Sequence, residues 1–140
     1  MNTYSDLKDI NTQLDIRLTI TPVGEPDFRV AVNNDVSEYT RLSDPIIFDY
    51  RVDLLDSIFV DIDLYNKHYT TEYETAIIIG LSIDNIEIIP KYDYLSEYEN
   101  DHDNNNPTSY MGFNGKWTLT IDEPFYHWLH KNSGQGWLLQ

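Results

Sequence analysis

The sequence predicts an all-β fold, an antiparallel β-sandwich of jelly-roll type with one short α-helix near the C-terminus. Apolar and polar residues alternate in roughly six or seven segments, the period of strands with one buried face. Residues that favour turns separate these segments. No helical crossover units lie between them, which disfavours a parallel sheet because parallel strands need long connections.

Length and composition predict one acidic domain. The chain has 140 residues, no cysteine and a net charge of −15. We expect a flexible arm over 1–13, a sandwich domain over 14–131 and an apolar tail over 132–140. So few Lys and Arg argue against direct binding to nucleic acid, whose phosphates need cations. The sequence shows neither a secretory signal nor an apolar run long enough for a membrane span.

The first half of the chain supplies four expected strands. Alternation is clear over 14–20, 28–32, 46–54 and 58–64. Asp56 and Ser57 are expected to turn the chain between the last two of these strands. Asp61 and Asp63 should then face outward, beside a similar polar row (Asp49, Arg51 and Asp53) on the strand expected to be their neighbour.

The second half supplies two more strand regions and the helix. Alternation continues over 77–89, with a turn or bulge near Asn85, and 92–110 is predicted to be a long polar surface loop. Asn114-Gly115 is typical of a tight hairpin turn, and 116–121 of a strand. Asp122 and Pro124 fit the first turn of a helix. The inward residues of one core are expected to be Ile16, Leu18, Phe48, Tyr50, Val60, Ile62, Ile79, Leu81, Trp117 and Leu119.

Aromatic residues are the main candidates for a binding site. Tyrosines concentrate in the two long polar segments, and exposed Tyr beside Asp and Asn suits both sugar stacking and protein interfaces. Trp137 in the apolar tail either folds back on the sandwich or inserts into a partner. The candidate binding residues are Tyr65, Tyr69, Tyr73, Tyr92, Tyr94 and Trp137.

No cofactor is expected other than calcium. Asn33, Asn34 and Asp35 offer the oxygen ligands that calcium prefers, although such residues also form turns. The chain contains no phosphate-binding glycine loop, nucleophile elbow or cysteine nucleophile, so an enzyme is not expected and no catalytic residue is assigned.

Four stretches, 61–67, 83–88, 114–119 and 124–129, resemble small proteins of tailed bacteriophages, especially phages of marine and cyanobacterial hosts. The middle of those proteins looks like a carbohydrate-binding-module type of β-sandwich. Residues 28–35 also look like part of a calcium-dependent xylan-binding module. The resemblance implies a carbohydrate-binding-module-like fold and a phage origin.

These observations leave three functions open. The main prediction is a non-enzymatic virion-associated protein, a capsid decoration or a tail or neck accessory. It would bind other phage structural proteins in a homo- or hetero-oligomeric assembly, in the virion or in the host cytoplasm during assembly. The first alternative is a module that binds host-surface glycans, with or without calcium. The second is an acidic DNA mimic that inhibits a host defence protein.

Overall fold

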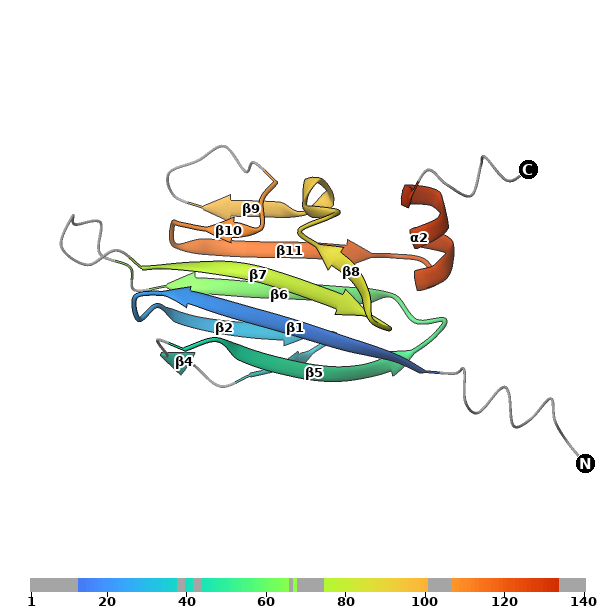
Figure 1. Cartoon of the computed structure of the whole chain (residues 1–140), viewed down its shortest axis with the longest axis horizontal. Helices are drawn as coiled ribbons and strands as arrows, with labels where there is room; N and C mark the ends of the chain where they lie inside the picture. The colour runs from blue at the N-terminus through green and yellow to red at the C-terminus, as the bar shows by residue number, and fades with distance from the viewer. Residues whose placement is uncertain are drawn as a thin grey trace, which may run out of the picture.

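The computed structural model describes residues 13–37, 40–41, 44–65, 67, 75–100 and 107–133. Two antiparallel sheets pack face to face (Figure 1). Sheet A has the order β10 (Tyr110–Met111), β7 (Ala76–Ile83), β1 (Gln13–Val23) and β5 (Ile46–Asp53), with β8 (Ile86–Ile89) paired to β7. Sheet B has the order β3 (Asp35–Val36), β2 (Asp27–Val32), β6 (Ile58–Tyr65), β11 (Gly115–Ile121) and β9 (Glu97–Asn100), with β4 (Thr40–Arg41) paired to β2. The predicted antiparallel β-sandwich is confirmed.

Both sheets contribute their alternating apolar residues to one core. β1, β7, β6 and β11 show the expected alternation of buried and more exposed positions, which places every second side chain between the sheets. Eight of the ten predicted inward residues are fully buried, and Phe48 and Tyr50 are half-buried and pack against the same core. Among the described residues, the largest fully buried side chain is that of Trp117, in the middle of β11.

Tight turns lie where residues adopt positive φ. Asn33 and Asn34 join β2 to β3 with φ of 49° and 73°, and Asp84 and Asn85 join β7 to β8 with φ of 51° and 65°. Asn and Asp tolerate this region better than other non-glycine residues, so the sequence favours a hairpin at both places. The turn predicted near Asn85 is confirmed.

The hairpin predicted at Asn114-Gly115 is wrong. The two residues are absent from the positive-φ positions of the described chain, and β11 begins at Gly115. Asn114 instead braces a neighbouring segment. Its Oδ1 accepts a hydrogen bond from the Lys67 backbone N–H at 2.8 Å, and its Nδ2 donates to the Lys67 carbonyl at 3.1 Å.

The loop predicted over 92–110 contains regular structure. A short 3-10 helix, η1 (Asp93–Leu95), is followed by β9, which pairs with β11 at the margin of sheet B. Tyr98 is 3% exposed between the exposed Glu97 and Glu99. A single buried residue gives too little alternation to identify a strand from sequence. Pairing with β11 supplies the rest of its stabilisation.

β5 and β6 are not neighbours, which corrects the predicted adjacent rows of acidic residues. β5 pairs with β1 in sheet A, and β6 lies between β2 and β11 in sheet B. The short turn between them crosses from one sheet to the other, because both strands must direct their apolar rows into the same core. Asp49 and Asp63 therefore face solvent on opposite sides of the molecule.

Helix α2 (Phe125–Ser133) follows β11 and buries Phe125 and Trp128. It begins just after Pro124, as the sequence predicts for a residue that lacks a backbone N–H. Within the described residues, no helix combines the length and apolar character needed to cross a membrane. The segments 1–12 and 134–140, which make up most of the predicted arm and tail, lie outside the described residues.

Candidate functional site

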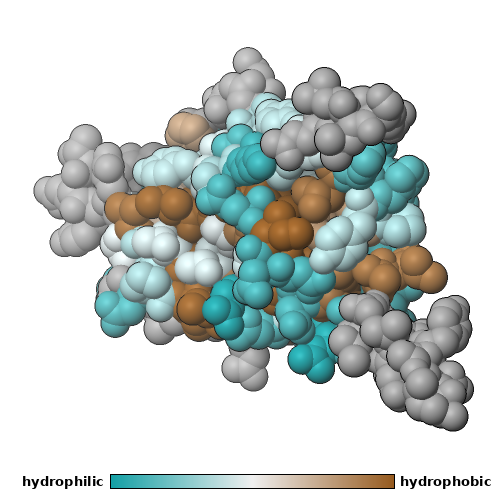
Figure 2. Space-filling model, turned by 45° about the vertical axis from the view of Figure 1, so that its right-hand side comes forward, coloured by the Kyte–Doolittle hydropathy of each residue, from teal (hydrophilic) through white to brown (hydrophobic). Residues whose placement is uncertain are grey.

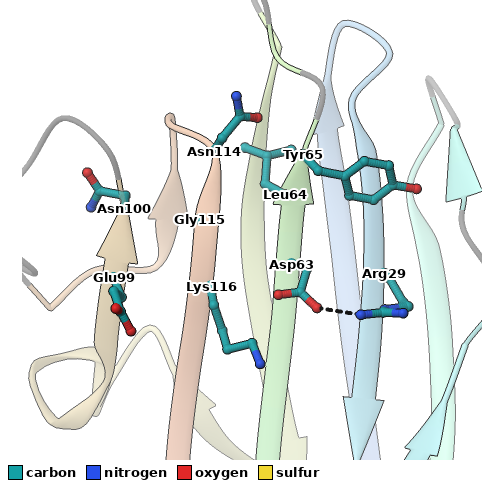
Figure 3. Close-up of a pocket in the computed structure, with 9 residues that line it drawn as sticks. All are labelled: Arg29, Asp63, Leu64, Tyr65, Glu99, Asn100, Asn114, Gly115 and Lys116. Atoms are coloured by element: carbon teal, nitrogen blue, oxygen red, sulfur yellow. Dashed lines mark hydrogen bonds and ion pairs between the residues drawn. The ribbon is translucent and has the colours of Figure 1, made fainter.

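An open cleft of about 790 Å³ lies on the outer face of sheet B, toward the ends of β6 and β9 (Figure 3). Strands β2, β6, β11 and β9 contribute residues to it, together with the segment that precedes β11. The lining residues are Arg29, Asp63, Leu64, Tyr65, Glu99, Asn100, Asn114, Gly115 and Lys116. Most of these side chains come from strands, so the sheet holds them at fixed spacing.

A row of alternating charges crosses the floor of the cleft. Arg29 is the register partner of Asp63, and Lys116 is the register partner of both Asp63 and Glu99. The row therefore reads Arg29, Asp63, Lys116, Glu99 across β2, β6, β11 and β9. Arg29 Nη2 donates to Asp63 Oδ2 at 3.2 Å, and Figure 3 shows the Lys116 side chain extending from β11 toward β6, below that carboxylate. The Arg29–Asp63 ion pair on adjacent strands holds these two side chains in place without a ligand.

The upper part of the cleft is less charged. Tyr65, the last residue of β6, extends its ring toward β2, and Asn114 and Asn100 lie on the other side of Leu64 (Figure 3). Asn100 Nδ2 donates to the Tyr98 carbonyl at 3.1 Å. An aromatic ring thus shares one open hollow with two amides, each of which carries donors and an acceptor.

Gly115 lines the cleft where β11 lies against β9. A Cβ atom on Gly115 would lie 2.2 Å from the Glu99 carbonyl oxygen and 2.8 Å from Asn100 Cα. Both are backbone atoms, so no side-chain rearrangement could make room for a larger residue. Gly115 therefore permits the close approach of β9 to β11 at the margin of the cleft.

Tyr98 fixes the segment just before Gly115. Its hydroxyl donates to the Phe113 carbonyl and accepts from the Phe113 N–H, the latter at 2.8 Å. Since Tyr98 is itself buried, this pair of hydrogen bonds anchors the backbone that carries Asn114. Tyr98 thus connects the segment that carries Asn114 to the buried core.

The predicted binding tyrosines do not come together. Tyr65 lies in the cleft, whereas Tyr94 is 56% exposed in η1, before the start of β9. Tyr92 is 3% exposed and packs edge-on against Trp128 at 5.4 Å, so it stabilises the core and presents no surface to a ligand. Tyr69, Tyr73 and Trp137 lie outside the described residues.

The residues predicted to bind calcium form a turn, and the side chain of the first of them, Asn33, already makes hydrogen bonds within the protein. Asn33 Nδ2 donates to the Ser57 carbonyl at 2.9 Å, and Asn33 Oδ1 accepts from the Phe59 N–H at 2.7 Å. Asn34 and Asp35 are exposed at the β2–β3 turn. Among the described residues, no three His, Cys, Asp or Glu side chains group closely enough to hold a metal.

Arginines interrupt the acidic character of both outer faces. On sheet A, Arg17 Nε lies 3.0 Å from Asp49 Oδ1, and Arg51 Nε lies 3.1 Å from Asp15 Oδ1. The cleft adds its own Arg–Asp pair on sheet B. A surface that mimics DNA needs unpaired carboxylates in an array like that of phosphates. Paired rows of this kind therefore argue against DNA mimicry on these two faces.

Several cleft residues could not be identified from the sequence. Arg29 and Lys116 stand at ordinary outward positions of alternating strands, and 87 positions separate them in the chain. Only the strand order β2-β6-β11-β9 brings them together, and sequence alternation does not determine strand order. The Asn114-Gly115 pair precedes Lys116 and is the one local signal in this part of the sequence. It predicts a turn, and it does not indicate a binding site.

No family model matches the chain, and no curated protein matches it. Solved structures of a carbohydrate-binding module are among those similar to it. One is a carbohydrate-binding module, vCBM60, in complex with galactobiose, with 10% identity and a TM-score of 0.49 over 77% of this chain and 97% of that one. Another is a selenomethionine form of vCBM60 from work on two families of calcium-dependent carbohydrate-binding modules, with 12% identity and a TM-score of 0.46 over 79% and 91% of the two chains. Similarity this low identifies no ligand and no binding residue in this chain. The phage origin and the virion location stay predictions.

Proposed function

We propose that this protein is a non-catalytic glycan-binding module whose ligand lies in the cleft on the outer face of sheet B. The observation that carries the proposal is the combination of the Tyr65 ring with planar polar side chains in one open, strand-built hollow. Of the tyrosines predicted to bind a ligand, the proposal gives the role of contacting the sugar to Tyr65.

The cleft chemistry matches the two surfaces of a sugar ring. A pyranose has a C–H face that packs against an aromatic ring, and a rim of hydroxyls that both donate and accept hydrogen bonds. Tyr65 offers the aromatic surface. Asp63 and Asn100 carry acceptor oxygens, and Asn100 and Arg29 carry N–H donors, within the same hollow. Asn114 braces the neighbouring Lys67 backbone through both of its polar atoms. A few placed polar groups around an apolar contact are typical of small-molecule sites.

The local charge favours a neutral glycan. The chain carries a net charge of −15, yet the row across the cleft contains two cations, Arg29 and Lys116, and two carboxylates, Asp63 and Glu99. Within the described part of the chain, the side chains of Lys116 and Glu99 have no hydrogen bond or ion pair to another residue. They can therefore contact hydroxyls without first breaking a contact with each other. A balanced row gives little attraction for uronic acids or sulfated sugars, and the rest of the chain repels them.

Titration calorimetry against neutral oligosaccharides, chosen from a glycan array run with calcium and with a chelator, tests the proposal. The informative variant is Tyr65→Ala, and its matched control is Tyr110→Ala, which removes an exposed tyrosine (49% exposed) from sheet A. We expect Tyr65→Ala to weaken binding by about tenfold, the scale of one aromatic contact. Tyr110→Ala should bind like the parent.

Two results would contradict the proposal. One is the absence of neutral glycan binding both with calcium and with the chelator. The other is a loss of binding in Tyr110→Ala together with unchanged binding in Tyr65→Ala. Thermal melts of both variants, compared with the parent, separate a lost contact from a lost fold.

A further inference from the structure

Strand β5 forms a long open edge of sheet A. Its eight residues, Ile46–Asp53, pair with β1 along one side, and no described strand pairs with its other side. Figure 1 shows β5 along the lower margin of the molecule, and Figure 2 shows apolar side chains reaching the surface of the sandwich. An unpaired edge presents a row of backbone N–H and C=O groups that can accept a further strand.

The inward side chains of β5 are also incompletely covered. Ile46, Phe48, Tyr50 and Val52 point toward the core but are only half-buried, whereas the corresponding row of β1 is at most 1% exposed. A strand added beside β5 would cover these side chains and would also form hydrogen bonds with the unpaired backbone groups of β5. β5 also contains neither Pro nor Lys, two residues that commonly protect natural edges.

Among the self-pairing registers that overlap most of β5, the charges on its outer side favour one. Residues directly opposite in an antiparallel pair lie on the same face of the sheet. A two-fold axis must therefore lie between one residue of β5 and the same residue of the second copy, and it is named by that residue. An axis through Asp49 or Arg51 brings two identical charges together. An axis through Tyr50 places Asp49 of each copy opposite Arg51 of the other, twice in the dimer.

The same register brings no like charges together elsewhere, since it places Ile47 opposite Asp53 of the second copy on the outer side. On the inner side it places Phe48 opposite Val52 of the second copy, an apolar pair. On the outer side it extends contacts that already exist, because Asp49 is paired with Arg17 and Arg51 with Asp15 in each copy. The resulting row reads Arg17, Asp49, then Arg51 and Asp15 of the second copy, with alternating sign throughout.

We infer that β5 is a dimerisation edge, at which a second copy of this chain pairs antiparallel about a two-fold axis through Tyr50 and joins the two copies of sheet A into one continuous sheet. One strand pair buries little surface, so the dimer is weak and depends on protein concentration. The Asp49–Arg51 pairs specify its register.

Two charge reversals test the inference, with sedimentation velocity over a concentration series of the full chain. Asp49→Arg places an arginine opposite Arg51 of the second copy, and Arg51→Asp places an aspartate opposite Asp49. We expect each variant alone to dimerise at least about tenfold more weakly than the parent. An equimolar mixture should recover dimerisation, because the arginine introduced in one variant then faces the aspartate introduced in the other. Native mass spectrometry of the mixture should show the heterodimer in preference to either homodimer.

The matched control is Glu87→Arg, which makes the same charge change at an exposed position of β8, beyond the opposite side of sheet A. It should dimerise like the parent. A parent that stays monomeric at its highest soluble concentration would overturn the inference. So would dimerisation unaffected by either reversal, or a mixture of folded variants that forms no heterodimer.

Discussion

Replacing Trp117 with alanine tests the assignment of the core most directly. Trp117 is 0% exposed, and its register partners are Ile62 on β6 and Tyr98 on β9. Its indole Nε1–H donates to the Thr108 carbonyl at 2.7 Å. Truncation removes the apolar contacts and leaves a cavity between the sheets, which costs about 3–5 kcal/mol for a buried Trp. A domain of this size has a free energy of unfolding of roughly 5–15 kcal/mol, so a large share of the stability is lost.

A second variant separates packing from hydrogen bonding. Trp117→Phe keeps an aromatic ring in the site but loses the bond to Thr108. The Thr108 carbonyl then keeps at most a share of the single Ser96 hydroxyl proton, because Ser96 Oγ lies 3.1 Å from it and 2.6 Å from the Asp93 carbonyl oxygen. We therefore expect Trp117→Phe to lose about 1–2 kcal/mol, clearly less than Trp117→Ala.

Urea unfolding followed by far-ultraviolet circular dichroism measures both effects without relying on the fluorescence of the residue that is changed. The expected loss for Trp117→Ala corresponds to a fall in melting temperature on the order of 10–20 °C. Thr120→Ala, an exposed change on the same strand, should stay within about 0.5 kcal/mol of the parent. If Trp117→Ala unfolds at the same urea concentration as the parent, the assigned inner face of β11 is wrong.

Three further predictions follow from the cleft margin, the β2–β3 turn and α2. Gly115→Ala should destabilise the fold by more than about 2 kcal/mol, because its Cβ would overlap the backbone of β9; a urea midpoint equal to that of the parent would contradict that close approach. Asn33→Gly keeps the positive φ but removes both side-chain hydrogen bonds to the β6 segment, so urea unfolding should show a loss of about 1 kcal/mol, and no loss would refute the brace. The Lys131 ammonium, 2.6 Å from Glu123 Oε1, lowers the pKa of the Glu123 carboxyl. A lowered pKa stabilises the fold above the unfolded-state pKa, and that contribution is lost as the pH falls through the folded-state value. Glu123→Gln should therefore melt below the parent near neutral pH and converge with it in acid, and a constant difference across a pH series of melts would contradict this linkage.

The parts of the fold that could be predicted are those with repeated alternation. β1 and β6 each place four apolar residues at every second position, and only an amphipathic strand satisfies that pattern. β9 offers one buried residue, Tyr98, and its identity as a strand depends on a partner that is distant in sequence until the chain folds. The local sequence pattern therefore could not predict β9, because pairing with β11 stabilises that strand.

The cleft also depends on contacts between residues that are distant in the sequence. Tyr65 could be proposed from its type and neighbourhood, since aromatic residues in polar segments are often used for binding. Arg29 could not be proposed, because an outward Arg on an alternating strand is ordinary until β6 is placed beside β2. The Asn114-Gly115 pair was misinterpreted for a related reason. Its glycine is required by the approach of β9, a tertiary contact, and the local backbone shows no positive φ there.

The cleft and the open edge belong to different sheets, and this separation affects how the protein would engage a polymer. A two-fold axis that pairs β5 with its copy stands perpendicular to sheet A, so both copies of sheet B turn their outer faces in the same direction. Two clefts would then address one surface at once. If the proposed glycan binding and dimerisation both hold, a polysaccharide bound in one cleft would keep the second at a high effective concentration near the next repeat. Such bivalency can raise the apparent affinity by about 10²–10⁴ over that of a single cleft, which would allow a shallow, weak site to retain a repetitive ligand.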